Sequence, residues 1–446
     1  MMLRRINPTM WAVWLMTVCK VPAATVVALH TTMDAFFAPL LPRIDAGVIS
    51  YAWMLLATYL STRPHWLDRL IGLPSIYMMH GVLGVAALAV AVLHRIDLPA
   101  YGPAKWAGEV AFWMLLALVV VALVTLSGWL SGRFVAAAKL RRSVERVVPR
   151  EGSVWLHRLL LVAVVAVAVH MNLVWYIAQN VVFVSLMNAC TAVVLVWCVL
   201  SKLRERFGAA RGSVLSVASL ADGVWQIEVS VPSMADGWLE GDFVFLRFPG
   251  IHGMHALHPF SVVNRPNAAG MMMFVIRADG DFTRMVGSEL NPGTVTEVVG
   301  PYGRYRPFID GHDRHAVVVG RTGGVPSRRC IRMRPVVAYA GGIGVTPLLP
   351  VIRYVNERGY DVTMLYSART NADLLYHDEL LRWAARTGNR IRMRVGRFTE
   401  DEFVDAMRPG ALYLIGGPES MRRDVTRILI RHGVRSCDIC YEPFVW

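Results

Sequence analysis

Charged residues are scarce in this 446-residue chain, at 17%, whereas hydrophobic residues make up 55%. This balance excludes an ordinary soluble enzyme, in which about a quarter of the residues are charged. The scarcity is uneven, because roughly the first two hundred residues hold long uncharged runs and the remainder has ordinary charge with many Gly and Pro residues. The composition therefore predicts a membrane half fused to a soluble half.

Cysteine is also sparse, and its six positions are scattered, which excludes a disulfide framework. Cys437 and Cys440 form a CxxC pair, but without a second pair or a histidine cluster they favour a terminal strand over a metal or redox centre. The start of the chain lacks the short apolar core and cleavage site of a secretory signal. We therefore expect the first apolar run to stay in the protein.

Long apolar runs dominate the first half of the chain. Lys20 lies within the first run, where its charge should face the bundle interior or reach the interface. Runs of about twenty apolar residues can cross a bilayer, and together they predict an all-α membrane bundle of six helices. The six runs cover 9–30, 45–61, 75–94, 107–130, 154–177 and 179–200.

Basic residues gather before the first run and after the second, fourth and sixth runs, so these segments share one side of the membrane. By the positive-inside rule that side is the cytoplasm, and it holds both the N-terminus and the C-terminal half. The net charge of +14 then reflects topology, and no nucleic-acid partner is needed to explain it. We expect an integral membrane protein of a bacterial inner membrane.

Four histidines lie in the third and fifth runs at matched spacing. His80 and His94 are fourteen residues apart, and His157 and His170 are thirteen apart. The two runs cross in the same direction, so the sequence predicts the pairs His80 with His157 and His94 with His170. Because a bis-histidine pair suits an electron-transfer haem, we expect two b-type haems at levels about 20 Å apart. The alternatives are polar residues satisfied inside the bundle, or a proton relay.

A regular helix does not orient both pairs equally well. At ~100° per residue, two histidines fourteen residues apart point in directions that differ by roughly 40° around the helix axis. Two histidines thirteen residues apart differ by roughly 140°. We therefore expect a bend, or a different ring approach, in the fifth run. On the outer side, the segments 31–44 and 95–106 carry few charges and indicate no acceptor site.

The C-terminal half begins with alternating strands and continues with strand and helix pairs. GVWQIEVSVPS, DFVFLRFPG and MMMFVIRA indicate a small antiparallel barrel. Gly280 and Thr283 open a helix whose amides would suit a diphosphate. Gly341, Gly342 and Gly344 form a turn between a buried strand and a helix, and the later alternation predicts a parallel nucleotide-binding sheet.

With these motifs in this order, the C-terminal half resembles the ferredoxin–NADP reductase superfamily. The chain as a whole resembles the ferric reductase and NADPH oxidase superfamily. The resemblance implies a transmembrane di-haem domain at 1–205, an FAD-binding β-barrel domain at 206–310, and an NAD(P)-binding α/β domain at 311–446.

The resemblance also implies which residues form the sites. Ser261 would place its hydroxyl near the flavin ring, and Phe444, or else Trp446, would cover that ring; Ser261 and Phe444 are the implied catalytic residues. Ser367 and Arg369 would meet an adenosine 2′-phosphate, which favours NADPH over NADH, although a solvated arginine is the alternative. The other implied FAD residues are His258, Pro259, Phe260, Gly280, Asp281, Phe282 and Thr283, and the implied nicotinamide-nucleotide residues are Gly341, Gly342, Gly344, Thr346, Pro347, Gly417 and Pro418, with the loop 300–303 (GPYG) beside them.

Two features depart from the family pattern. Gly416 precedes Gly417 and Pro418 where many relatives have Cys-Gly-Pro, so the usual thiol contact with the nicotinamide is missing. The stretch 320–335 resembles an extra basic loop, either solvated or in reach of a nucleotide phosphate or lipid headgroups.

The resemblance implies electron transfer from cytoplasmic NADPH through FAD and two haems to an outer acceptor. If the acceptor is a ferric chelate, the protein is a ferric reductase. If the acceptor is dioxygen, it is a superoxide-producing NADPH oxidase. A periplasmic protein acceptor would make it an electron-delivery subunit. The fourth interpretation is a membrane-anchored flavin reductase whose histidines bind nothing.

Overall fold

The computed structural model describes residues 8–31, 33–96, 98, 101–126, 135–145, 150–313 and 333–442. Phe444, Trp446 and most of the stretch 320–335 lie outside these residues. The chain divides into two compact units, described separately below. The helical unit comprises Thr9–Pro64 and Ser75–Phe207, and the sheet unit comprises Met1–Pro8, His65–Pro74 and Gly208–Trp446.

The helical unit contains six stretches that are long and apolar enough to cross a membrane, as the sequence predicts. They are Thr9–His30, Ala35–Leu60, Leu73–Arg95, Gly102–Thr125, Gly152–Leu173 and Val181–Phe207. The second begins ten residues before its expected start, because a 3-10 turn over Ala35–Leu40 leads directly into α3. The described helices are α1 (Pro8–Leu15), α2 (Val21–His30), α3 (Leu41–Leu60), α5 (Leu73–Arg95), α6 (Gly102–Thr125), α8 (Val135–Glu145), α9 (Arg150–His157), α10 (Leu160–Leu173), α11 (Trp175–Ala178) and α12 (Val181–Phe207).

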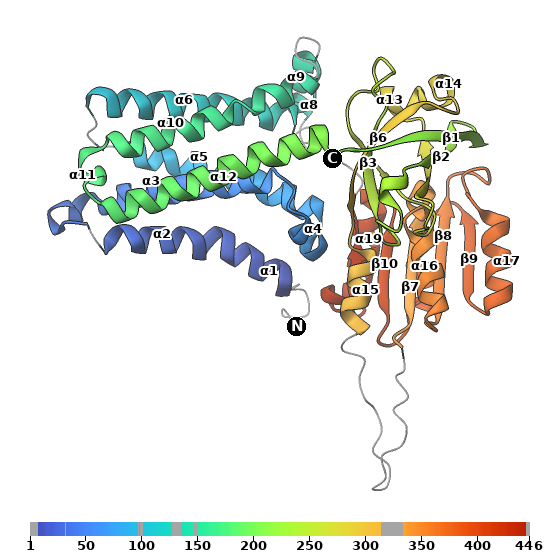
Figure 1. Cartoon of the computed structure of the whole chain (residues 1–446). Helices are drawn as coiled ribbons and strands as arrows, with labels where there is room; N and C mark the ends of the chain where they lie inside the picture. The colour runs from blue at the N-terminus through green and yellow to red at the C-terminus, as the bar shows by residue number, and fades with distance from the viewer. Residues whose placement is uncertain are drawn as a thin grey trace, which may run out of the picture. The chain divides into compact units, whose positions relative to one another are not determined.

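The long helices lie side by side (Figure 1). Many of their apolar side chains are exposed. Val181, Val182 and Val193 on α12 are each about two-thirds exposed, at 69%, 67% and 68%. An apolar outer surface suits lipid rather than water. Lys20 is the last residue of a π-helical turn over Met16–Lys20, and it is exposed. Of the two expectations for its charge, the one that Lys20 faces the bundle interior is wrong.

The sheet unit begins with a six-stranded antiparallel sheet in the order β4-β3-β6-β1-β2-β5. One isolated antiparallel bridge, between Val262 and Phe274, brings the two edges of the sheet together at a single point. The antiparallel sheet is confirmed, while its closure into a barrel stays a prediction. Its strands are β1 (Ala210–Ala221), β2 (Val224–Ser230), β3 (Phe243–Arg247), β4 (His258–Ser261), β5 (Met271–Arg277) and β6 (Val295–Tyr302), with the short helices α13 (Asp281–Arg284) and α14 (Val286–Glu289) after β5.

The second sheet is parallel throughout, in the order β11-β10-β7-β8-β9. Its central strand β7 is buried along its whole length, which explains the unbroken apolar run in the sequence. The strand order reverses between β7 and β10, and in such sheets ligands bind beyond the carboxyl ends at that point. The strands are β7 (Val336–Gly341), β8 (Val362–Ala368), β9 (Arg390–Val395), β10 (Leu412–Gly416) and β11 (Ile439–Tyr441).

The helices of the sheet unit include one from the first third of the chain, α4 (His65–Ile71). Besides α4, α13 and α14, the described helices of this unit are α15 (Tyr305–Asp313), α16 (Leu348–Glu357), α17 (His377–Thr387), α18 (Glu400–Asp405) and α19 (Glu419–Arg431).

Candidate functional site

Two glycine turns meet at the point where the parallel sheet reverses its order. A Cβ atom on Gly344 would lie 2.4 Å from the backbone nitrogen of Gly417, and one on Gly416 would lie 2.1 Å from the carbonyl oxygen of Gly344. Gly342 has a φ of +54° and open space around it. The turns after β7 and β10 therefore pack backbone against backbone, which only glycine permits.

The neighbouring residues of the predicted nucleotide site hold the turn or border it. Thr346 is buried, and its Oγ1 donates a 2.8 Å hydrogen bond to the carbonyl oxygen of Ile343, so the hydroxyl closes the turn. Ser367 pairs with Gly341 in the sheet register, and Arg369 follows on the exposed edge. The exposed guanidinium thus lies beyond the strand next to the glycine turn, where an anionic ligand can reach it. Pro347 is buried, whereas Pro418 is exposed.

The two segments predicted to hold a flavin contact each other through aromatic rings. The Phe282 ring lies 4.2 Å from the His258 ring and 5.9 Å from the Phe260 ring, centroid to centroid. In β4, Pro259 and Ser261 alternate to the other face and pair with Phe245 and Phe243 on β3. The structure therefore brings the segments 258–261 and 280–283 together on one side of the strand and leaves Ser261 on the opposite side.

The helix predicted to open at Gly280 is only one turn long, from Asp281 to Arg284. Thr283 Oγ1 accepts hydrogen bonds from the amides of Gly280, at 2.8 Å, and Asp279, at 3.0 Å. These two donors are already used, so a diphosphate would depend on the amides that follow. Asp281 is exposed beside them.

The part of the sheet unit with the antiparallel sheet and the part with the parallel sheet each match a known family. Residues 209–311 match the model for the FAD-binding domain, and residues 339–427 match the model for the oxidoreductase NAD-binding domain. The sheet unit carries an FAD- and NAD-binding oxidoreductase module. Six apolar helices followed by this module are consistent with the ferric reductase and NADPH oxidase superfamily.

Curated relatives of the oxidoreductase module include reductase components and electron-transfer subunits. The chain is 29% identical over 145 residues to the reductase component of propane 2-monooxygenase from Mycolicibacterium goodii. The match covers 32% of this chain and 35% of that protein. It is 23% identical over 172 residues to a homolog of the electron transfer subunit of dihydroorotate dehydrogenase B from Thermotoga maritima, covering 39% and 52%. The chain thus spans about a third to a half of these relatives.

Among solved structures, phthalate dioxygenase reductase is similar with 17% identity and a TM-score of 0.41, over 54% of this chain and 69% of that one.

In the helical unit, the four predicted histidines form two pairs. The ring centroids of His80 and His157 are 5.7 Å apart with planes at 77°, and those of His94 and His170 are 6.1 Å apart at 82°. Nδ1 of His80 donates to the carbonyl oxygen of Ala57 at 2.8 Å. His94 and His170 bond in the same way to Arg43 and Ala104, each at 2.8 Å. Since a carbonyl only accepts, Nε2 of these three rings keeps its lone pair.

The fifth apolar run is interrupted directly after His157. Helix α9 ends at that residue and α10 begins at Leu160, so Arg158 and Leu159 break the regular helix. This irregularity lies between His157 and His170, in the run for which the unequal spacing predicts a bend or a different ring approach. Among the described residues, no cluster of three or more His, Cys, Asp or Glu side chains could hold a metal ion.

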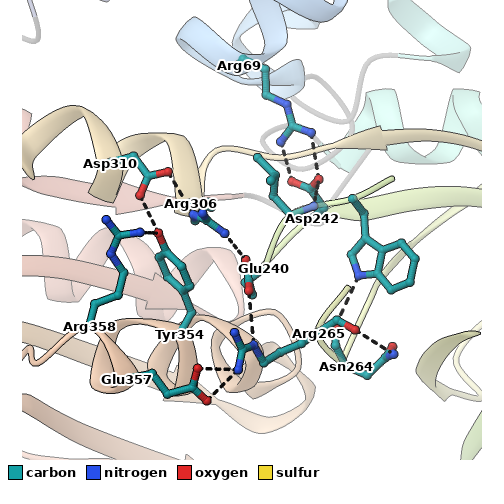
Figure 2. A network of polar contacts seen from close by, with 12 residues as sticks. Arg69, Glu240, Asp242, Asn264, Arg265, Arg306, Asp310, Tyr354, Glu357 and Arg358 are labelled. Carbon is teal, nitrogen blue, oxygen red and sulfur yellow. Dashed lines mark hydrogen bonds and ion pairs between the residues drawn. The ribbon is translucent and has the colours of Figure 1, made fainter. Parts of the chain in front are cut away.

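A charged network that the sequence did not reveal links α4 to the oxidoreductase module (Figure 2). Arg69 donates to both carboxylate oxygens of Asp242, at 2.5 and 2.8 Å. Asp242 is 1% exposed, and burial raises its pKa to about 6, although Arg69 opposes that rise. At neutral pH the pair is therefore a buried, bidentate ion pair, which is strongly orienting.

A second group of charged contacts begins at Glu240, two residues before Asp242, and extends to α16 (Figure 2). Arg306 donates to Glu240 at 2.5 Å, and Arg265 bridges Glu240, at 3.3 Å, to Glu357 at the end of α16, at 2.6 Å. Tyr354 on α16 donates to Asp310 at 3.0 Å. These pairs join α16, the helix that follows the Gly341–Pro347 turn, to α15 and to the loop between β4 and β5.

The packing of the two turns predicts the effect of a single methyl group. In Gly344→Ala the new Cβ meets backbone atoms that cannot rotate away, so we expect a loss of about 1–3 kcal/mol of stability and a higher KM for NADPH. Thermal unfolding and NADPH-dependent flavin reduction of the full chain measure these effects. Gly311→Ala is the matched control, because its Cβ meets open space within α15; equal behaviour of the two variants would contradict the backbone packing.

Proposed function

We propose that this chain transfers electrons from cytoplasmic NADPH across a membrane to an acceptor on the outer face, most simply as a ferric reductase. The family matches support a module that binds FAD and a nicotinamide nucleotide, and six apolar helices support a membrane-spanning part. The observation that carries the proposal is the meeting of four histidines in two pairs inside that helical part. We assign residues 1–205, 206–310 and 311–446 to the membrane, FAD and nucleotide domains.

The histidine pairs are the residues that would hold the haems. Metal–imidazole bonds are about 2 Å long, and the centroid distances of 5.7 and 6.1 Å would leave room for a metal atom between the two rings of each pair. A Cβ on Gly47 would lie 2.5 Å from Nδ1 of His94, and one on Gly108 would lie 2.9 Å from Nδ1 of His170, so glycine makes room for both outer rings. Gly81 and Gly84 on α5 face open space, as a cradle for a macrocycle requires.

The carriers supply the redox chemistry, since a flavin takes a hydride and returns single electrons, and haem carries one electron at a time. The chain holds and orients them. The carbonyl groups of Ala57, Arg43 and Ala104 fix three histidine tautomers, which is how backbone acceptors set the orientation of metal ligands. His157 differs, because its buried Nδ1 has no hydrogen-bond partner.

On the nucleotide side, we propose that Ser367 and Arg369 bind the 2′-phosphate of NADPH, that Gly341–Pro347, Gly417 and Pro418 hold its diphosphate and nicotinamide, and that the segments 258–261 and 280–283 hold FAD. Ser261 and Phe444 are the proposed residues at the flavin ring.

An anaerobic optical spectrum tests the route. We expect two b-type haems and one FAD per chain, with the haem bands becoming reduced after NADPH is added. His94→Leu should lose one haem and keep FAD, because it removes one ligand of the outer pair only. Full haem content in His94→Leu would sink the ligand assignment, and flavin without haem in the wild type would favour the anchored flavin reductase.

The nucleotide preference rests on Arg369. In Arg369→Ala we expect kcat/KM for NADPH to fall at least about tenfold, the effect of losing a charged hydrogen bond, while that for NADH changes little. Steady-state flavin reduction with both nucleotides measures the ratio. Arg386→Ala, an exposed arginine on α17, is the control; an equal loss with NADH would show that Arg369 does not read the 2′-phosphate.

The acceptor separates the remaining possibilities. For a ferric reductase we expect NADPH-dependent reduction of a ferric chelate that superoxide dismutase and anaerobiosis leave intact. Dye reduction that superoxide dismutase abolishes would instead indicate an NADPH oxidase. Haem that NADPH reduces but that neither small acceptor reoxidises would indicate an electron-delivery subunit for a periplasmic protein.

A further inference from the structure

Helix α4 directs its polar contacts at one short loop of the oxidoreductase module, Gly300–Arg304. Asp68 accepts a 3.0 Å hydrogen bond from the amide of Gly303. Arg69 donates to the carbonyl oxygen of the same residue at 2.8 Å, in addition to its ion pair with Asp242. The carbonyl oxygen of Ile71 accepts from Nη1 of Arg304 at 3.1 Å. One turn of helix thus holds both backbone groups of Gly303.

The loop is shaped for this contact. Gly303 has a φ of +146°, and a Cβ there would lie 2.6 Å from a carboxylate oxygen of Asp242. Gly72 has a φ of +83°, and its Cβ would lie 2.6 Å from the Arg304 side chain. Glycine on both sides lets the backbones approach closely. The His65 ring also stacks on the buried Tyr302 ring at 4.7 Å, and burial lowers the pKa of His65, which keeps the ring neutral.

The helix is joined almost directly to a proposed haem ligand. Gly72 alone separates Ile71 from Leu73, the first residue of α5. His80 lies seven residues further along α5, a rise of about 10 Å. The chain therefore passes from the loop contact to the histidine through one glycine and two turns of helix.

On the far side, the loop is tied to the C-terminal strand. The amide of Arg304 donates to Glu442, whose carboxyl is buried and has its pKa raised well above its ordinary value by that burial. Tyr305 donates a 2.7 Å hydrogen bond to the carbonyl oxygen of Ile415 at the end of β10. The same loop therefore contacts α4, the antiparallel sheet and the nucleotide edge.

We propose that Asp68 and Arg69 are positioning residues for electron transfer out of the oxidoreductase module: by holding Gly303 and Asp242, they fix the module to the segment that leads into α5. This inference rests on the proposed function. It assigns to the two residues no part in hydride transfer from NADPH, which takes place at the nucleotide edge.

The test compares two rates in the same anaerobic stopped-flow experiment on the full-length protein. After mixing with NADPH, we expect flavin reduction in Arg69→Met and in Asp242→Asn to stay within about twofold of wild type, while haem reduction slows at least tenfold. The double variant should be no slower than either single one, since both remove the same contact. Arg69→Lys, which keeps the charge and loses the bidentate geometry, should recover part of the rate.

Arg277→Met is the matched control. Arg277 is 24% exposed, against 25% for Arg69, and its 2.7 Å ion pair is with Asp373, which lies between β8 and α17. We expect it to leave the ratio of haem to flavin reduction unchanged. Hydrogen exchange gives a readout without haem: the Gly303 amide should lose at least tenfold protection in Arg69→Met and none in Arg277→Met.

The outcomes separate the two proposals. A wild-type protein whose haem is absent, or is not reduced by NADPH, would overturn the proposed function and this role with it. Normal haem reduction in wild type, with flavin and haem rates that fall together in the Arg69 and Asp242 variants, or with an unchanged ratio, would overturn the positioning role alone. An equal loss in Arg277→Met would do the same.

Discussion

The buried ion pair between Arg69 and Asp242 is the strongest of the polar contacts that join residues 65–74 to the rest of the sheet unit. A carboxylate that is 1% exposed is costly unless a cation and hydrogen bonds compensate it. Arg69 and the amide of Leu239 meet that need at Asp242, and the amides of Gly303 and Leu73 meet it at Asp68. Removing one partner of such a pair leaves a buried charge, so the contact tolerates little change on either side.

Much of the architecture could be predicted from the sequence because single physical signals carried it. Uninterrupted apolar length indicated the six helices, and the glycine turn after a buried strand indicated the parallel sheet. The four histidines could be placed in pairs because a polar ring in an apolar helix needs a partner. The unequal spacing indicated only an irregularity in the fifth run, and not its position after His157.

Other features could not be predicted, for reasons that are equally physical. Helix α4 is one to two turns long, too short for a periodic pattern, and its partners Asp242 and Gly303 lie far along the chain. The one-turn helix at Asp281 and the internal use of the Thr346 hydroxyl depend on local hydrogen bonds that residue types do not reveal. The early start of the second apolar stretch arose because the 3-10 turn over Ala35–Leu40, with Pro39 inside it, continues directly as α3, which has Pro42 in its first turn.

The separation of 173 residues between Arg69 and Asp242 also sets an order of events during synthesis. At about 5–20 residues per second, a ribosome needs roughly ten to thirty-five seconds to reach Asp242 after Arg69 has been made. For that interval Asp68 and Arg69 have no carboxylate or loop to bind, and water must solvate them. The segment between the second and third apolar helices is therefore synthesised well before the residues that it binds in the folded protein. The first apolar helices can insert into a membrane before those residues exist.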